Sequence, residues 1–420
     1  TITAARMKRI YNMERIYPKA TITEKGEKAL RGGHPWIYAE EVTAIDGAYE
    51  NGGLVDVLSR KGRYLGTGYI NDNSKIRIRV ISRNANDRFD RDFYARRIRY
   101  ALDYRRTVMG AEDFRCCRLI FGEADSFPGF TVDRFGDVLV TQVLSLGTER
   151  VKETLYELLV QTLEEMGEHI TALYERNDVK IRELEGMEEY KGFWNGAGLR
   201  TDLSGITEIT ENGIRYTVDY INGQKTGFFL DQKYNRQAIR RIAEGRTVLD
   251  CFTHTGAFAL NAAAAGAKLV NAVDISADAV EMTRRNAELN GLSGNMEFTK
   301  ADVFDLLTEL YRQGGHPYDF IILDPPAFTK SSSTVKSAER GYKEINLKAM
   351  RLLPRGGYLA TCSCSHFMTE TLFRHMLHDA AADAGVSLRQ IEARRQSPDH
   401  PILWNVPETD YLKFYIFQVV

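Results

Sequence analysis

Apolar and amphipathic segments alternate from residue 226 to residue 420, which predicts strands and helices in turn. The segments typical of strands are 247–252, 269–274, 295–300, 320–324, 357–364, 386–394 and 414–420, with helical segments between the first six. Such alternation forms a doubly wound, mostly parallel sheet, whose ligands bind at the carboxyl ends of the strands. We therefore expect a seven-stranded, Rossmann-like α/β domain over residues 226–420.

The pattern differs in the first part of the chain, where glycine turns separate short β-like runs between residues 20 and 82. Runs at this spacing predict a small β-barrel, which we assign to residues 17–85. In the last run basic and apolar residues alternate, so Lys75, Arg77 and Arg79 are expected on one positively charged face. Residues 1–16 show no strong periodicity and are treated as an N-terminal extension.

Residues 86–225 predict a linker helix followed by a central α+β domain. The helix is expected at 89–109, where aromatic residues and arginines recur at helical spacing. Strands are expected within 118–146 and at 170–175 and 214–219, with an acidic amphipathic helix at 149–167. No motif in this domain indicates chemistry.

The composition fits two or three soluble domains, because 43% of the 420 residues are hydrophobic and 27% are charged. No apolar run approaches the roughly 18 residues of a membrane helix, so we expect no membrane partner. The five cysteines show neither a spaced framework nor a C-x-x-C pair. This pattern favours a reduced, cytoplasmic location without a structural metal site.

Charge is distributed unevenly along the chain, although its formal net value is only −1. Residues 1–106 hold 22 Lys and Arg against 13 Asp and Glu, and the remainder holds 34 against 44. Positive charge is concentrated over residues 75–106. This stretch suits either contact with a polyanion or a solvated basic helix.

Aspartates stand at or just beyond the ends of the first four predicted strands of the C-terminal domain: Asp250, Asp274, Asp302 and Asp324. The ends of parallel strands line one crevice, so the four carboxylates are expected to converge. Asp274 suits the two hydroxyls of a ribose. Asp302 could meet an adenine edge, although an aspartate after a strand is often only a helix N-cap.

The stretch 248–256 predicts a buried strand, a tight turn at Gly256 and a closely packed, alanine-rich helix, which is the outline of a nucleotide-cofactor site. It lacks the Gly-x-Gly-x-x-Gly pattern and the lysine that cradle phosphates, and Asp250 would repel them. A carboxylate here suits a cofactor with a positively charged amino acid portion, such as S-adenosyl-L-methionine. This exclusion predicts a methyltransferase.

A second motif, Asp324-Pro325-Pro326-Ala327-Phe328, directly follows the fourth predicted strand. Its two prolines fix the backbone and remove two amide donors, so the Asp324 carboxylate and a neighbouring carbonyl can face an amino-bearing base. Phe328 could stack on that base, with Pro325 and Pro326 beside it. The motif therefore predicts a nucleobase pocket.

These motifs, together with Thr-Gly-Phe-Phe-Leu-Asp-Gln at 226–232 and the N-terminal barrel, resemble the PUA-domain-containing class I methyltransferases that form 5-methylcytosine in large-subunit (23S) ribosomal RNA. The resemblance covers nearly the whole chain. It implies a PUA-like RNA-binding domain, naked or partly assembled 23S rRNA as partner, and a homodimer. With the strand-end pattern, it implies that the cofactor contacts are Phe229, Asp231, Gln232, Asp250, Phe252, Thr255, Gly256, Asp274, Ile275, Asp302 and Val303.

Cys364 lies in Thr-Cys-Ser-Cys-Ser-His at 361–366, at the end of the fifth predicted strand. Methylation of pyrimidine carbon 5 requires that carbon to become nucleophilic, which a thiolate achieves by adding to carbon 6. In the resembling family the cysteine of Ser-Cys-Ser is this nucleophile, which implies Cys364, with Cys362 deeper in the sheet. Many such enzymes have a second cysteine for product release after the motif proline, and Ala327 stands there instead. Cys362 and His366 are then the nearest candidates for the eliminating base.

Three alternatives stay open. Guanine-N methyltransferases share the Asp-Gln and Asp-Pro-Pro-x-Phe pieces but need no thiolate, so Cys364 argues against them. Uridine-C5 enzymes share a strand-end Ser-Cys, but an Asn-Pro usually follows it, where this chain has Ser365-His366. A catalytically silent PUA-type RNA-binding factor would retain the fold alone, and the intact carboxylate series argues against it.

Overall fold

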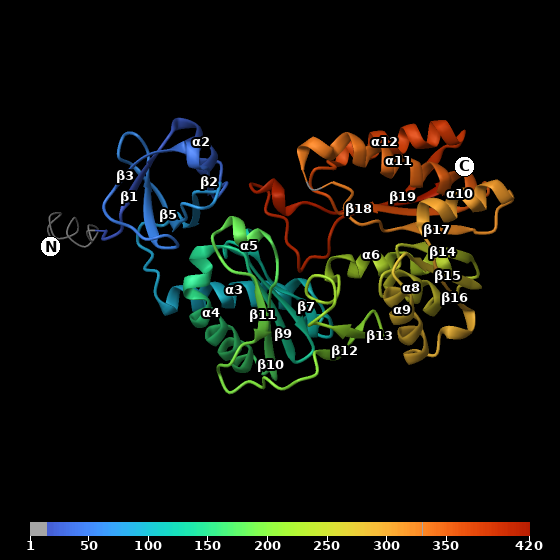
Figure 1. Ribbon diagram of the computed structural model, residues 1–420, viewed down its shortest axis with the longest axis horizontal. Coiled ribbons are helices and arrows are strands. Elements are labelled where there is room, and N and C mark those ends of the chain that lie inside the picture. The colour runs from blue at the N-terminus through green and yellow to red at the C-terminus, as the bar shows by residue number, and fades with distance from the viewer. Residues whose placement is uncertain (1–14, 330) are drawn as a thin grey trace, which may run out of the picture.

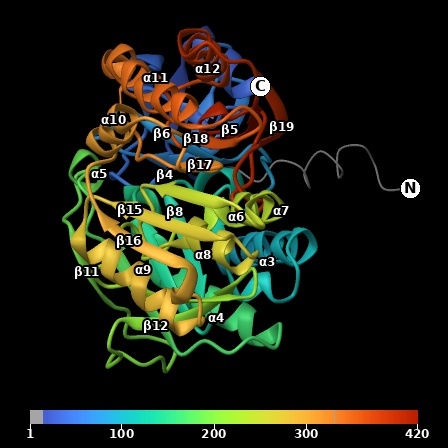
Figure 2. The same ribbon diagram turned by 90° about the vertical axis from the view of Figure 1, so that its right-hand side faces the viewer.

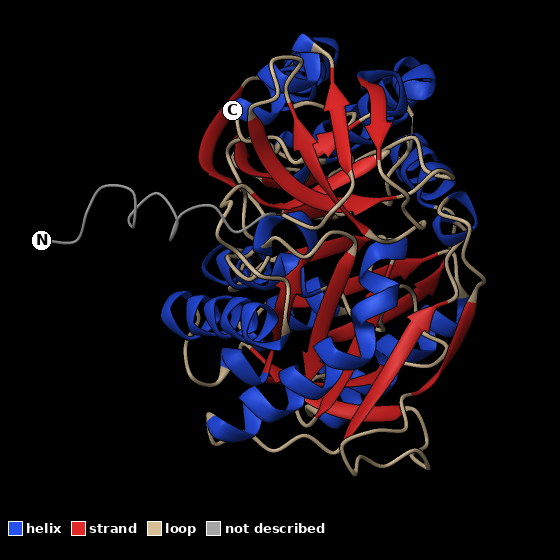
Figure 3. Ribbon diagram, turned by 90° about the vertical axis from the view of Figure 1, so that its left-hand side faces the viewer, coloured by secondary structure: helices blue, strands red, loops and turns tan. Residues whose placement is uncertain are grey.

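The computed structural model describes residues 15–329 and 331–420, except the side chain of Ser332, so most of the predicted N-terminal extension lies outside the described residues. Within them the strands form sheets of six, five, two and seven strands, drawn in red in Figure 3. None of the described helices is long and apolar enough to span a membrane.

The N-terminal domain is built on a six-stranded sheet in the order β2-β6-β5-β4-β1-β3 and carries a helix, α2 (Glu24–Arg31), that was not predicted. The helix begins after Thr23, whose side chain accepts a hydrogen bond from the Gly26 amide, and it buries Leu30. The strands are β1 (Lys19–Ile22), β2 (Trp36–Ile37), β3 (Val42–Asp46), β4 (Leu54–Leu58), β5 (Tyr64–Ile70) and β6 (Ile78–Ser82).

The last strand of this domain is shorter than predicted, because β6 begins only at residue 78. Lys75 lies exposed in the bend before it, and Arg77 also precedes the strand, so only Arg79 of the three lies within β6. Arg79 is only 12% exposed, and its guanidinium pairs with Glu123 at 3.2 Å and Glu185 at 2.9 Å in the central domain. This pairing argues against contact between Arg79 and a polyanion.

The central domain has the expected linker helix and α+β pattern. The helix α3 (Arg91–Val108) packs on α4 (Leu146–Glu165), and a five-stranded sheet follows the order β11-β10-β9-β8-β7. A hairpin of β12 and β13, of which β12 was not predicted, shares its buried core with β14 of the next domain. The remaining elements are β7 (Cys116–Phe121), β8 (Phe130–Phe135), β9 (Val138–Val143), β10 (Ala172–Asn177), α5 (Ile181–Leu184), β11 (Tyr190–Phe193), β12 (Ile206–Glu211) and β13 (Ile214–Asp219).

The C-terminal domain confirms the predicted Rossmann-like α/β fold. Its seven-stranded sheet has the order β16-β15-β14-β17-β18-β20-β19, and β20 runs antiparallel to both neighbours. The strands are β14 (Thr247–Cys251), β15 (Leu269–Asp274), β16 (Met296–Lys300), β17 (Phe320–Leu323), β18 (Tyr358–Ser363), β19 (Leu388–Arg394) and β20 (Lys413–Val419).

Helices cover both faces of this sheet (Figures 1 and 2). On one face lie α10 (Val303–Gln313), α11 (Val335–Leu352) and α12 (Glu370–Ala384), and on the other lie α8 (Ala257–Ala264) and α9 (Ala277–Leu289). Two short helices, α6 (Lys233–Ala238) and α7 (Arg240–Ala243), lead into β14. Because helices cover both faces, the sheet is accessible to solvent mainly at the ends of its strands, where the connecting loops lie.

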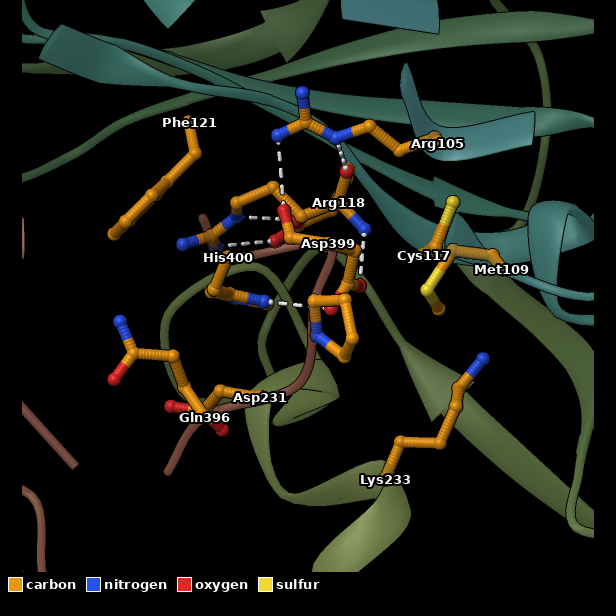
Figure 4. A network of polar contacts seen from close by, with 12 residues as sticks. Arg105, Met109, Cys117, Arg118, Phe121, Asp231, Lys233, Gln396, Asp399 and His400 are labelled. Carbon is orange, nitrogen blue, oxygen red and sulfur yellow. Dashed lines mark hydrogen bonds and ion pairs between the residues drawn. The ribbon is translucent and has the colours of Figure 1, made fainter. Parts of the chain in front are cut away.

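The segment between β19 and β20, residues 395–412, reaches from the C-terminal sheet toward the N-terminal domain (Figure 1) and is held by a buried carboxylate (Figure 4). The Asp399 side chain is fully buried and accepts a hydrogen bond from the Arg118 amide at 2.8 Å. The Arg105 guanidinium donates to the Asp399 carbonyl at 2.9 Å. Farther along, His34 Nε2 lies 3.1 Å from a Glu408 oxygen. The segment therefore joins all three domains.

Replacement of this carboxylate should destabilise the whole chain. We expect Asp399→Ala to lower the free energy of unfolding by about 2–4 kcal/mol, because it leaves a buried amide without its acceptor and nearby cations without their counter-charge. The matched control is Asp379→Ala on the exposed face of α12, with an expected change below about 0.5 kcal/mol. Urea-induced unfolding measures both, and equal effects would contradict the central role of Asp399.

Candidate cofactor and catalytic site

The loop after β14 turns sharply, because three of its residues have left-handed backbone angles: φ is 63° at Phe252, 51° at His254 and 82° at Gly256. Such angles are costly for residues other than glycine, and they cluster at ligand sites. A Cβ atom at Gly256 would lie 2.5 Å from Cγ2 of Thr283, so a larger residue does not fit. The turn brings the backbone close to the N-terminus of α8 at the carboxyl edge of the sheet.

Asp250 is fully buried in β14 beneath this turn. Its Oδ2 accepts hydrogen bonds from the Thr253 hydroxyl at 2.6 Å and the Ala259 amide at 3.0 Å, while Oδ1 has no partner among the described residues. Burial raises the pKa of Asp250 to about 7. A buried carboxylate oxygen without a partner fits the ammonium group of a bound amino acid portion, which supports the expected orientation of S-adenosyl-L-methionine.

Asp274, at the end of β15, fixes the shape of the same loop. Its Oδ2 accepts a hydrogen bond from the His254 amide at 3.0 Å, and its Oδ1 accepts one from the Ser276 amide at 2.9 Å. The Thr255 carbonyl is held from the other side by Asn286 Nδ2 at 3.0 Å. The amides of His254 and Ser276 thus set the orientation of the Asp274 carboxylate, and its contact with a ribose stays a prediction.

Asp302 caps α10, as the simpler interpretation of the sequence held. Its Oδ1 accepts hydrogen bonds from the amides of Phe304 at 2.8 Å and Asp305 at 3.3 Å. Val303 beside it is buried in the core between the sheet and α10, whereas Ile275 is 64% exposed after β15. The adenine contacts expected of this group stay a prediction.

Phe229, Asp231 and Gln232 come from the segment before α6. The Phe229 ring lies 5.1 Å from the His254 ring, which brings this segment against the β14 loop. Asp231 is buried, and its Oδ2 accepts a hydrogen bond from the Tyr411 hydroxyl at 2.7 Å, while its Oδ1 has no partner among the described residues. Burial alone would raise the pKa of Asp231, but nearby positive charges and this hydrogen bond lower it. A second carboxylate oxygen is thus available in this region.

Asp324 connects three segments of the chain through side-chain hydrogen bonds. Its Oδ1 accepts hydrogen bonds from the Cys362 thiol at 2.8 Å and from Gln232 Nε2 at 3.1 Å. Burial raises the pKa of Asp324 to about 6. Of the two following prolines, Pro325 is buried and Pro326 is exposed. The carboxyl can therefore carry a proton close to neutral pH while its position is fixed.

Phe328 anchors the Asp-Pro-Pro loop to the helix layer. Its ring lies 4.6 Å from the Tyr342 ring of α11 and 5.9 Å from the Phe304 ring of α10, and the side chain is half-buried. These contacts account for an aromatic residue at this position without a ligand. Its stacking on a base stays a prediction.

Cys364 is the first residue after β18 and is partly exposed, whereas Cys362 is 1% exposed within the strand. Burial and the nearby Asp324 raise the pKa of the Cys364 thiol to about 11, and Lys225 acts in the opposite direction. The remaining cysteines, Cys116, Cys117 and Cys251, are buried in the core, as expected. Among the five cysteines, all of which are described, Cys364 is thus the one that a substrate can approach.

Two lysines near this thiol escaped the sequence analysis. Lys413, the first residue of β20, is buried and donates hydrogen bonds to the carbonyls of Ser365 at 2.6 Å and Tyr411 at 2.8 Å. Burial lowers its pKa to about 8. Lys225 lies 5.1 Å from the centre of the Phe229 ring. The sequence could have indicated Lys413, because it is a lysine at the start of an otherwise apolar strand. It held no comparable indication for Lys225.

Comparison with known proteins places these features in a family. Residues 131–417 match a family described as S-adenosylmethionine-dependent methyltransferases, and residues 20–83 match a PUA-like domain. The chain is 41% identical over 388 residues to ribosomal RNA large subunit methyltransferase I of Aeromonas salmonicida, covering 92% of this chain and 96% of that one. It is 38% identical over 407 residues to the protein of the same name from Klebsiella pneumoniae, covering 96% and 99%.

Solved structures show the same fold over nearly the whole chain. A protein from Streptococcus mutans has a TM-score of 0.79 at 23% identity, and another, complexed with SAH, has a TM-score of 0.80 at 22% identity. Each comparison covers 96% of this chain and 100% of the solved chain. At these identities the likeness concerns the fold alone.

Replacement of Asp250 should change the pH dependence of stability and weaken cofactor binding. Its pKa of about 7 lies above the ordinary 3.8, so folding takes up a proton between these pH values and stability falls as pH rises through 7. From about pH 5 to about pH 8, the free energy of unfolding of the wild type should decrease. We expect this decrease to be about 2–3 kcal/mol smaller in Asp250→Asn. It should also bind S-adenosyl-L-methionine at least roughly tenfold more weakly, because a neutral amide attracts an ammonium group less.

Urea unfolding at both pH values and titration calorimetry measure these effects. The exposed Asp278→Asn is the matched control and should change neither. Wild-type cofactor affinity in Asp250→Asn would contradict the assignment of the free Oδ1 to the ammonium group.

Removal of Lys225 should make the Cys364 thiol harder to ionise. The positive charge of Lys225 lowers the pKa of the Cys364 thiol. In Lys225→Gln, the pH at which iodoacetamide begins to alkylate Cys364 rapidly should therefore be higher than in the wild type. Mass spectrometry of the labelled peptide follows the reaction, and Lys268→Gln, exposed before β15, is the control. An unchanged profile would show that Lys225 does not influence this thiol.

Proposed function

The chain belongs to the S-adenosylmethionine-dependent methyltransferases, and within them to the ribosomal RNA large subunit methyltransferase I family, and we propose that it forms 5-methylcytosine in large-subunit rRNA through a covalent adduct of Cys364. The substrate in this proposal is 23S rRNA, naked or partly assembled, and the enzyme acts as a homodimer. The PUA-like domain supplies one of the RNA contacts.

The observation that carries the proposal is a reachable thiol and a half-buried carboxyl at the ends of two adjacent strands. In the parallel pair of β17 and β18, Leu323 is in register with Thr361, so Asp324 and Cys364 follow at the same edge of the sheet. A target base must leave its stack to enter such a crevice. There Asp324, in its protonated form, donates a hydrogen bond to N3 of the cytosine and accepts one from its N4 amino group.

The reaction proceeds by addition and elimination. The Cys364 thiolate forms a bond to C6, and the electron pair of the C5–C6 double bond makes C5 nucleophilic. When bound, S-adenosyl-L-methionine supplies an electrophilic methyl group, so that C5 gains a methyl group and S-adenosylhomocysteine is left. A base then takes the C5 proton, the double bond forms again, and the C6–S bond breaks to release the thiolate.

The base that takes the C5 proton is constrained by the contacts of the two candidates. Cys362 fits this role poorly, because its thiol is buried and donates its hydrogen to Asp324. His366 is exposed two residues after Cys364. Cys362 is better assigned to holding the Asp324 carboxyl in position.

The thiol has a direct test. We expect Cys364→Ala to lower methyl transfer to large-subunit rRNA by at least about 10³-fold while it retains binding of S-adenosylhomocysteine, because only the covalent step is removed. Cys362→Ala is the matched control and should retain much more activity. Nucleoside analysis of wild-type product RNA distinguishes 5-methylcytosine from 5-methyluridine and 7-methylguanine. Full activity in Cys364→Ala would contradict the covalent step, and a different nucleoside would contradict the base.

A further inference from the structure

An open groove lies outside the catalytic crevice, between α3 and the short helix η3 (Gly122–Asp125). It has a volume of about 670 Å³, and Arg96, Arg97, Tyr100 and Tyr104 of α3 line it. A second hollow of about 220 Å³ shares Arg97 with it and continues toward the N-terminal domain and the β19–β20 segment. The two hollows adjoin at Arg97 and Ser126.

Two tyrosine rings stand in this groove with their surfaces in solvent. Tyr100 is 64% exposed and Tyr104 is 38% exposed, and the two are one helical turn apart. Arg96 lies one turn before Tyr100 on the same face. A stripe of one arginine and two tyrosines offers flat rings beside a positive charge, which is the arrangement that unstacked bases and phosphates require.

The charge of the groove is positive, because ion pairs already neutralise its carboxylates. Both oxygens of Asp125 accept hydrogen bonds from Arg105, at 2.6 and 2.7 Å. Asp87 accepts hydrogen bonds from Ser82 and Asn84 and pairs with Arg96 at 3.4 Å. The groove therefore does not repel a phosphate.

Arg97 supplies the excess positive charge. Its guanidinium donates to the Ser126 carbonyl at 3.0 Å and lies 4.3 Å from the centre of the Phe93 ring. It forms no ion pair with any other described residue. A guanidinium held in place by these two contacts is ready for an anionic partner.

The groove is connected to the candidate active site through the β19–β20 segment. The Tyr104 hydroxyl donates to the Pro398 carbonyl at 3.1 Å. One residue earlier, the Ser397 amide donates to the carbonyl of Asp231 at 2.7 Å, and Asp231 is one of the expected cofactor contacts. These two contacts fix the position of the groove relative to the candidate active site.

We infer that this groove binds single-stranded RNA next to the target nucleotide, with a base stacked on Tyr100 and a phosphate beside Arg97. The inference rests on the proposed function for its substrate class. Single-stranded RNA fits better than a duplex, because the exposed rings need a free base face. The contact carries no sequence code and serves to hold the strand in register with the crevice.

The test uses Tyr100→Ala, Tyr100→Phe and Arg97→Gln in the full chain. Anisotropy of a fluorescein-labelled oligouridylate of about 12 nucleotides measures binding directly, without catalysis. We expect Tyr100→Ala to weaken binding by roughly tenfold or more and Tyr100→Phe to retain it, because stacking needs only the ring. Arg97→Gln should lower the slope of log affinity against log salt by about 1.

The same variants are assayed for methyl transfer to large-subunit rRNA. Tyr100→Ala should raise KM for RNA with little change in kcat and unchanged binding of S-adenosylhomocysteine. The matched control is Tyr311→Ala with Arg312→Gln at the end of α10, an exposed tyrosine and arginine away from the groove. A thermal melt of each variant shows whether it is folded.

The outcomes separate the two proposals. Wild-type affinity and KM in folded Tyr100→Ala, with active wild-type enzyme, would overturn the groove and leave the proposed function intact. A wild-type enzyme that methylates no RNA would overturn the proposed function, while the anisotropy of Tyr100→Ala still decides on the groove. Equal losses in Tyr100→Phe or in the α10 control would also overturn the groove.

Discussion

The buried carboxylate of Asp399 determines how the three domains are assembled. It lies in the segment between β19 and β20, yet its acceptor atoms serve the amide of Arg118 in the central domain, and Arg105 of α3 binds its carbonyl. A charge buried in this way is tolerated only when its partners are fixed, so the segment has one place to lie. The contacts with Arg118 and Arg105 thus hold this segment against the central domain, and its Ser397 amide also binds the Asp231 carbonyl.

Other buried carboxylates have the opposite energetic character. Burial raises the pKa of Asp250 to about 7 and that of Asp324 to about 6, so their ionised forms cost stability in the folded chain. Each lies at the carboxyl edge of the sheet, beside a loop of the candidate cofactor and catalytic site. Strain at Phe252 and His254 lies in the same place. The ionised carboxylates and the strained backbone thus lie at the site where a positively charged cofactor and a base would offset their cost in stability.

Local pattern was sufficient for the strands of the C-terminal sheet, for α3 and for the strand-end aspartates, because apolar periodicity and strand order determine them. It was insufficient where distant residues decide. Arg79 was expected in solvent from its alternation, but Glu185, more than a hundred residues later, binds its guanidinium. The contact between Gln232, Asp324 and Cys362 likewise joins residues from three distant segments. No spacing along the chain encodes such pairs.

Under the proposed function, the groove along α3 adds an RNA contact to that of the PUA-like domain. Positive charge along the chain is a poor guide to a binding face, because ion pairs consume much of it: Arg79 and Arg105 both bind carboxylates inside the protein. What counts is charge without an internal partner next to flat, exposed surface. Arg97 and Tyr100 meet that condition, and the Asp399 contact fixes their helix relative to the crevice. A rigid connection of this kind lets contacts distant from Cys364 position the base that reaches it.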